Sequence, residues 1–285
     1  MTSMSAMWVG RAIAFAGVIG FVAACGSNPS PPPSLTAPSS PSTATASPSA
    51  GVAPTPSATA TASPSAAVLD RNPAAFVEGQ PYEVTIDPAD FAAVIDNPFM
   101  PLKPGTKISF DGAERVEITI TTETKTILGV PATVVRDQVF LNGELEEDTF
   151  DWFAQDRNGN VWYFGEKTAE YANGKVVSTA GSWTGGVDGA LPGIIMLADP
   201  RVGDVYRQEF YKGQAEDIGE VTGVGGSITV PLGTFTDILV TEEWTPLEPN
   251  VRERKTYVPG IGVVETRVIK GGRGVTKIVA FKPGG

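Results

Sequence analysis

Residues 115–128 read RVEITITTETKTIL, a run in which β-branched residues alternate with polar ones. Alternation of this kind gives a strand one set of side chains on each face, and β-branched residues favour strands. Asn142-Gly143 follows, a dipeptide that accepts positive φ at both central positions of a tight hairpin turn. Asn173-Gly174 repeats the signal. The stretch therefore predicts antiparallel strands joined by short turns.

The same alternation continues toward the C-terminus. It predicts further strands at residues 205–211, 227–230, 235–245, 252–258, 263–269 and 275–281. One short helix is expected at residues 88–95, with Asp87 as the cap and Pro88 in the first position. Because an open sheet of about a dozen strands normally curls or closes, we expect an all-β, mainly antiparallel fold. Its form is predicted to be a curved meander sheet, a half-barrel or an open barrel with one short helix.

The N-terminal residues have the pattern of an export signal. One basic residue, Arg11, precedes a mainly apolar run at 12–24, which is shorter than the roughly 20 residues of a membrane-spanning helix. Val22-Ala23-Ala24-Cys25 resembles a bacterial lipobox. The resemblance implies a signal peptide at 1–25, cleavage before Cys25, lipidation of its thiol and acylation of the new N-terminus. Since two or more acyl chains anchor a protein stably, we expect export and attachment to the outer face of the bacterial cell membrane.

The segment 26–69 has the composition of a disordered stalk. Of its 44 residues, 37 are Ser, Thr, Pro or Ala, and no charged residue lies between Arg11 and Asp70. Such a segment has too little apolar surface to offset the entropy of ordering. Residues 70–285 are then predicted to form a single β domain.

Composition excludes several classes of function. The chain has no histidine, and its one cysteine is expected to carry lipid, so histidine-based triads, cysteine nucleophiles and histidine-ligated metal sites are excluded. Loss of the signal peptide leaves 20 basic and 32 acidic residues, a balance that argues against nucleic-acid partners. Neither a cofactor nor a metal is predicted. Asp156, Asn158 and Asn160 resemble the start of a calcium loop, but Lys167 stands where a bidentate Glu is needed.

Two motifs carry a family resemblance. NPFMPLKPGT at 97–106 and TYVPGIGVVE at 256–265 resemble the bounds of a class of exported bacterial β proteins. Between them, DWFAQDRNGNVWYFGE at 151–166, GSWTGGVDGALPGIIM at 181–196 and YRQEFYKGQAED at 206–217 resemble one subfamily of that class. A more distant likeness is to half-barrel lipoproteins that shelter lipophilic molecules. The resemblance implies membership and fold, and no particular chemistry.

Aromatic residues around residues 150–164 are candidates for a binding surface. With a four-residue loop at 156–159, one face would carry Phe150, Trp152 and Tyr163, and the other Phe153, Trp162 and Phe164. A sheet that is apolar on both faces must be covered on both, and one covered face could be a hollow, with 190–197 as its rim or lid. The candidate ligand-binding residues are Phe150, Trp152, Trp162, Tyr163 and Trp183. Core packing alone is the other explanation of the same pattern.

The acidic run ELEEDTFD at 144–151 is the second candidate site. Alternation places Glu147 and Asp151 on one face, and Glu166 can approach from the next strand. Paired carboxylates are what glycoside hydrolysis requires, although a solvated strand end explains them too. The favoured function is non-catalytic binding of a small lipophilic or envelope-derived ligand by a membrane-anchored lipoprotein. The alternatives are a carboxylate-dependent hydrolase of envelope glycans and a structural envelope protein.

Overall fold

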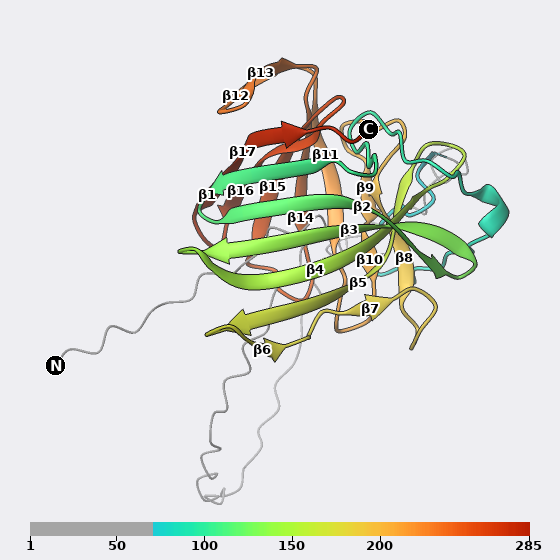
Figure 1. Cartoon of the computed structure of the whole chain (residues 1–285). Helices are drawn as coiled ribbons and strands as arrows, with labels where there is room; N and C mark the ends of the chain where they lie inside the picture. The colour runs from blue at the N-terminus through green and yellow to red at the C-terminus, as the bar shows by residue number, and fades with distance from the viewer. Residues whose placement is uncertain (1–70) are drawn as a thin grey trace, which may run out of the picture. The chain divides into compact units, whose positions relative to one another are not determined.

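The computed structural model describes residues 71–285; the expected signal peptide, lipobox and stalk lie outside them. Both Asn-Gly dipeptides form the predicted turns, with positive φ at Asn142, Gly143, Asn173 and Gly174. Hairpins of this kind follow one another along the chain, so the sheet is antiparallel throughout. Figure 1 shows the resulting strands.

The described residues form seventeen strands. The first five strands in the chain form one wall of the sheet: β1 (Lys107–Gly112), β2 (Arg115–Ile127), β3 (Val130–Leu141), β4 (Glu144–Gln155) and β5 (Val161–Ala172). Shorter strands follow: β6 (Lys175–Ser178), β7 (Trp183–Thr184), β8 (Leu191–Met196), β9 (Val205–Arg207), β10 (Glu209–Phe210), β11 (Ile218–Val224), β12 (Ser227–Val230) and β13 (Gly233–Thr236). The last are β14 (Leu239–Trp244), β15 (Arg252–Val258), β16 (Gly262–Lys270) and β17 (Gly274–Lys282).

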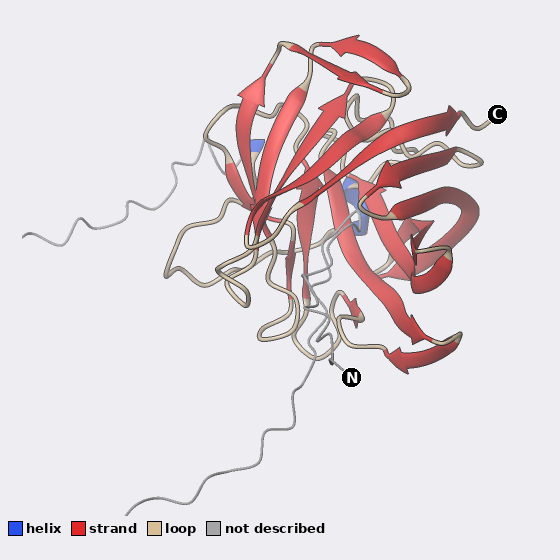
Figure 2. Ribbon diagram, turned by 90° about the vertical axis from the view of Figure 1, so that its left-hand side faces the viewer, coloured by secondary structure: helices blue, strands red, loops and turns tan. Residues whose placement is uncertain are grey.

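Fifteen of these strands belong to one antiparallel sheet that is nearly closed into a barrel. Its order is β10-β8-β5-β4-β3-β2-β1-β17-β16-β15-β14-β11-β9, with β6 and β7 attached to β5. Figure 2 shows the sheet curving round on itself. β12 and β13 form a separate hairpin. The prediction of an all-β, antiparallel barrel-like fold is confirmed.

The two edges of this sheet are consecutive in the chain. β9 pairs with β11 and β10 pairs with β8, and only Gln208 separates β9 from β10. One extended segment thus serves both edges and leaves a single seam between β9 and β8. Residues 74–76 lie along this seam: Ala75 pairs with Tyr206, and the Phe76 amide donates to the Val205 carbonyl at 2.9 Å.

The predicted helix at 88–95 is much shorter in the structure. Only Pro88–Asp90 forms a 3-10 turn, capped as expected by Asp87, whose Oδ1 accepts from the Ala89 amide. Phe91 then becomes extended and pairs with Asp156. The Ala92 amide donates to the Gln155 carbonyl rather than back into a helix, which is why the turn ends.

The predicted lid at 190–197 is also different, because most of it is strand β8. Ile194, Ile195, Met196 and Leu197 are all fully buried. A continuous apolar run is what a strand covered on both faces requires, so this segment is part of the sheet instead of a rim above it.

The two motifs of the family resemblance meet in space. The Gly260 amide donates to the Pro98 carbonyl at 2.8 Å. Asn97 is buried, and its Nδ2 donates to the carbonyls of Gly159 and Leu197 while its Oδ1 accepts from the Phe99 amide. The motif at 97–106 therefore joins three loops of the barrel.

Within residues 71–285, no helix is long and apolar enough to cross a membrane.

Candidate functional site

The hairpin of β4 and β5 positions most of the predicted site residues. Its loop has five residues rather than four, because the Asp156 amide donates to the Asn160 carbonyl. Gln155 therefore pairs with Val161, and Phe153 with Tyr163. A shift of one residue exchanges the faces of one strand relative to the other. The prediction that Tyr163 shares a face with Phe150 and Trp152 is wrong: it stacks on Phe153, with ring centroids 4.9 Å apart.

Glycine at position 165 changes the alternation of β5. Between the pairs Asp151–Glu166 and Phe153–Tyr163, β5 has one more residue than β4, which is a β-bulge. Gly165 has φ of +127°, and a Cβ there would lie 2.4 Å from the Trp183 carbonyl oxygen. Because of the bulge, Tyr163 and Glu166 point to the same face although they are three residues apart.

The structure brings Glu147, Asp151 and Glu166 together on the inner face of the barrel. Asp151 and Glu166 are directly opposite each other, and the Tyr163 hydroxyl donates to Asp151 Oδ1 at 2.8 Å. Sequence reasoning missed the other carboxyl groups that gather here. The full set, called the acid band below, has every member less than 10% exposed: Asp137, Glu147, Asp151, Glu166, Glu209, Asp217, Glu243 and Glu253.

Members of the acid band come from opposite walls of the barrel. The charge of Lys255 on β15 acts on Asp137 on β3 and on Asp151 on β4, where it offsets part of the rise that burial causes in both pKa values, although these strands are far apart in the sheet order. The lysine and the two aspartates can therefore interact only across the interior of the barrel. Lys255 itself is buried and contacts Glu243 at 2.6 Å between Nζ and Oε2. No single stretch of sequence shows this cluster, which is why it was missed.

Burial governs the protonation of the acid band. It raises the pKa of Asp151 to about 7, with Glu147 adding to the rise, and that of Asp217 and of Glu253 to about 8. For Asp137, Glu166 and Glu209, burial and neighbouring acids raise the pKa well above its usual range. Several of these groups therefore carry a proton at neutral pH.

Some acid-band oxygens have no hydrogen-bond partner among residues 71–285. Both oxygens of Asp137 and of Glu166 and one oxygen of Asp151 are in this state. Carboxylic acids tolerate such surroundings better than carboxylates, because burying an uncompensated charge costs far more than burying a neutral polar group. Residues 71–285 contain no grouping of three or more Asp, Glu, His or Cys side chains arranged to hold a metal ion.

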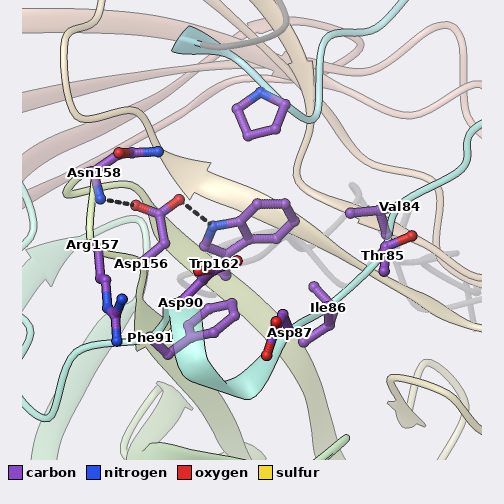
Figure 3. A pocket seen from close by; sticks show the side chains of 11 residues that line it. Val84, Thr85, Ile86, Asp87, Asp90, Phe91, Asp156, Arg157, Asn158 and Trp162 are labelled. Atoms are coloured by element: carbon purple, nitrogen blue, oxygen red, sulfur yellow. Dashed lines mark hydrogen bonds between the residues drawn. The ribbon is translucent and has the colours of Figure 1, made fainter.

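A pocket of about 480 Å³ lies outside the acid band (Figure 3). The segment from Val84 to Phe91 forms one wall, and the β4–β5 loop with Trp162 forms the other. Phe91 packs edge-on against Trp162 and Phe164, with centroid distances of 6.2 and 5.4 Å. Pro73, Val84 and Ile86 add apolar surface, and Thr85, Asp87, Asp90, Arg157 and Asn158 add polar groups.

Asp156 holds one wall of this pocket in place. Its Oδ1 accepts from the amides of Asn158 and Asn160, both at 2.9 Å. Its Oδ2 accepts from Asn160 Nδ2 and, at 2.8 Å, from Trp162 Nε1, as the dashed line in Figure 3 shows. Both carboxylate oxygens of Asp156 accept hydrogen bonds from the protein. The acidic and amide residues that make this turn resemble a calcium loop therefore serve to bond the turn together.

A second pocket, of about 330 Å³, contains two more predicted residues, Trp152 and Trp183. Its other lining residues are Lys125, Glu166, Lys167, Ser182, Thr184, Val187, Asp188 and Tyr211. Trp183 donates from Nε1 to Glu209 Oε2 at 2.8 Å and packs edge-on against Tyr163. Glu166 thus belongs both to the acid band and to the wall of a pocket.

The predicted ligand-binding residues are therefore divided among several places. Trp162 lines the first pocket, and Trp152 and Trp183 line the second. Tyr163 is fully buried inside the barrel. Phe150 lies under the Arg136 guanidinium, 5.4 Å from its ring centroid, and lines neither pocket.

No protein-family model and no curated protein sequence matches this chain. Two solved structures resemble it. One is a Bacteroides fragilis protein described as exported and as having a YmcC-like fold: TM-score 0.39, 14% identity, 65% of this chain and 99% of that chain covered. The other is a Parabacteroides distasonis protein described as a lipoprotein: TM-score 0.36, 12% identity, with the same coverage. Both TM-scores are low, so the fold described above rests on this chain's own strands.

Proposed function

We propose that the protein is a lipid-anchored extracytoplasmic lipoprotein whose β domain binds a small, largely apolar ligand without converting it. The binding site is the pocket of Phe91 and Trp162. The observation that carries the proposal is the make-up of this pocket of about 480 Å³: Phe91 and Trp162 lie beside the apolar residues Pro73, Val84 and Ile86, and the other six lining residues are polar or charged. Ligand sites typically combine apolar and aromatic surface with polar groups that fix the orientation of the ligand.

The walls of this pocket are fixed before any ligand arrives. Trp162 is held by its bond to Asp156, and Phe91 by its strand pairing with the same residue. A rigid aromatic wall loses little conformational freedom on binding, which favours affinity for a flat or compact apolar molecule. Asp87 and Asp90 at the rim favour a ligand without negative charge on that side.

Native mass spectrometry of the chain purified in mild detergent from its own host tests the binding role. Wild type should carry a small-molecule adduct, and Trp162→Leu should lose it while keeping a cooperative melt. Trp244→Leu is the matched control, since Trp244 lies under Arg252 and lines neither pocket. A wild-type protein without an adduct, or an adduct retained by Trp162→Leu, would contradict the proposal.

Anchoring rests on the lipobox at Val22–Cys25. Cys25→Ser removes the thiol that takes the lipid, so the variant should lose both lipid labelling and membrane fractionation. Retention of the variant in the membrane fraction at the wild-type level would show that another feature holds the protein there.

A carboxylate-dependent hydrolase is the second candidate, favoured by the pairing of Asp151 with Glu166. Burial raises the pKa values of both groups, as an acid catalyst requires. Asp151, however, is fully buried and lines neither pocket, and Glu166 borders a pocket but has both carboxyl oxygens covered by protein. Release of reducing sugar from host envelope glycan, abolished in Glu166→Gln, would put this candidate ahead.

A further inference from the structure

The second pocket has an unusual charge for this protein. Lys125 and Lys167 both line it, and within residues 71–285 neither has a carboxylate at salt-bridge distance. The chain as a whole has a formal net charge of −11. Two lysines left without counter-ions in an acidic protein mark a local site of positive potential.

The two lysines are also close to each other. Lys125 Nζ lies 3.1 Å from the centre of the Trp152 ring, whose face attracts a cation. Burial lowers the pKa of Lys125, and the charge of Lys167 lowers it further. Like charges held together in a pocket repel, and an anion placed between them would remove that repulsion.

Glu166 also lines this pocket. It is 1% exposed, and both of its carboxyl oxygens are covered by protein, so a ligand in the pocket does not contact them. Burial and the nearby acids Asp151 and Glu209 raise its pKa well above the usual range. A carboxyl group whose neutral form is favoured repels an anion in the pocket less than an ordinary carboxylate would.

The remaining lining residues define the rest of the ligand. Trp152, Trp183, Val187 and Tyr211 provide flat and apolar surface. The other charged residue types in the lining are Lys125, Lys167 and the exposed Asp188, whose formal charges sum to one positive charge. A volume of about 330 Å³ corresponds to roughly eleven water molecules at about 30 Å³ each, which suits a compact ligand.

We propose that the pocket lined by Lys125, Trp152, Glu166 and Lys167 is a binding site for a small aromatic monocarboxylate. The carboxylate takes the place between the two ammonium groups, and the ring lies against the tryptophan and valine surface. A long acyl chain exceeds the volume, and a polyanion exceeds the available positive charge. This site is separate from the pocket of Phe91 and Trp162 and does not depend on the function proposed for it.

The test uses the full chain in lipid nanodiscs, with empty nanodiscs as the blank. Binding of trans-cinnamate is measured by ligand-detected NMR and calorimetry, and is compared with neutral cinnamamide, which has nearly the same size. Cinnamate should bind saturably and at least about tenfold more tightly than the amide. Equal affinity for the two, or no saturable binding of cinnamate, would overturn the proposal.

Lysine variants locate the site. Lys167→Gln and Lys125→Gln should each weaken cinnamate binding about tenfold or more, whereas Lys103→Gln, an equal change of charge at an exposed position outside the pocket, should leave it unchanged. Lys167 is exposed, so its variant keeps the fold even if Lys125→Gln does not. Wild-type affinity in Lys167→Gln would refute the site. Trp162→Leu should bind cinnamate normally, which separates this result from the test of the other pocket.

Discussion

Two bands of the barrel interior bury side chains of opposite chemistry. On β1, β2 and β17 the inner face is apolar, with Ile108, Phe110, Val116, Ile118, Ile120 and Ile278. On β3 to β5 and on β14 and β15 it carries most of the acid band. The bands touch, since Ile118 of β2 is directly opposite Asp137 of β3.

The difference shows that one closed sheet can be stabilised in two ways. Burial of the apolar band is favourable at any pH, because no proton is gained or lost. Burial of the acid band is tolerated while those of its carboxyl groups with raised pKa values keep their protons and Glu243 is paired with Lys255, and it becomes costly as the protonated groups ionise. If this comparison is right, the stability of the domain depends on pH through one band only.

The largest expected effect is therefore that of pH itself. Asp151, Asp217 and Glu253 have folded-state pKa values of about 7, 8 and 8, above those of unfolded Asp and Glu near 4. A raised carboxyl pKa means that the folded state binds more protons between these values, so this contribution to stability is present at acidic pH and is lost as pH rises through 7–8. The Tm should fall by roughly 10 °C or more between pH 5.5 and 8.5 in calorimetry.

Asp137→Asn tests this dependence of Tm on pH by removing one titrating group of the acid band. Burial and the charges of Asp151 and Glu147 raise the pKa of Asp137, and an amide of the same size removes its titration. The variant should have a shallower fall of Tm with pH and a higher Tm than wild type at pH 8.5. A flat wild-type profile, or a steeper one in the variant, would show that the acid band does not control stability.

The next effect concerns Lys255, whose ammonium group contacts Glu243 inside the acid band. Lys255→Met leaves a buried carboxylate without its partner, which costs about 3–5 kcal/mol. The loss should be greater at pH 8.5 than at 5.5, because more of the surrounding carboxyl groups, Glu253 among them, are then ionised. Chemical denaturation at both pH values measures it.

A second substitution separates the charge from the packing of Lys255. Adding Glu243→Gln to Lys255→Met removes the uncompensated charge, so much of the lost stability should return. If the double variant is as unstable as the single one, the lysine stem matters through its packing and the electrostatic account of this pair is wrong.

A smaller effect is expected in the apolar band. Ile120 is fully buried, and Ile120→Val deletes one methylene group at a cost of about 0.5–1.5 kcal/mol. The Tm should drop by about 2–4 °C for each kcal/mol in a domain of this size. Because no titrating group is involved, the drop should be equal at pH 5.5 and 8.5, and a clear difference between the two would contradict the separation of the bands.

The strands of this fold could be predicted from the sequence because their signals are local. Alternation gave β2, β12 and β15 to β17 within about one residue, and the Asn-Gly dipeptides gave two turns. The closure could not be predicted, because β9 and β10 are one short segment whose two halves pair with different partners. The sequence of residues 205–210 alone does not indicate which strands these two halves pair with.

The candidate site was predictable only where its residues lie on neighbouring strands. Glu147, Asp151 and Glu166 were found from alternation, while Asp217, Glu243 and Glu253 come from the opposite wall. The register of the aromatic residues was wrong by one position, because the Asp156 amide bonds to the Asn160 carbonyl and Gln155 therefore pairs with Val161 instead of Asn160. The bulge at Gly165 could not be predicted either, since it depends on the close approach of Trp183.

The smallest effect is expected for a glutamate on the outer face of the same barrel. Glu265 of β16 accepts from Arg267 at 3.0 Å and from Lys277 at 3.2 Å, and these partners are 43% and 34% exposed. Its neighbour Thr266 is directly opposite Lys255 on the inner face, so alternation places Glu265 outside. Because Arg267 and Lys277 are well exposed, water screens these ion pairs although Glu265 itself is only 8% exposed, and Glu265→Gln should cost only about 0.2–1 kcal/mol. The cost should shrink further in 1 M salt, where the screening length is about 3 Å, while that of Lys255→Met should change little. Denaturation of both variants at low and high salt makes the comparison.

A loss of stability for Glu265→Gln as large as that for Lys255→Met would contradict this account. The face of the sheet would then not determine the free-energy cost of a carboxylate, and the distinction between the two interior bands would lose its physical basis.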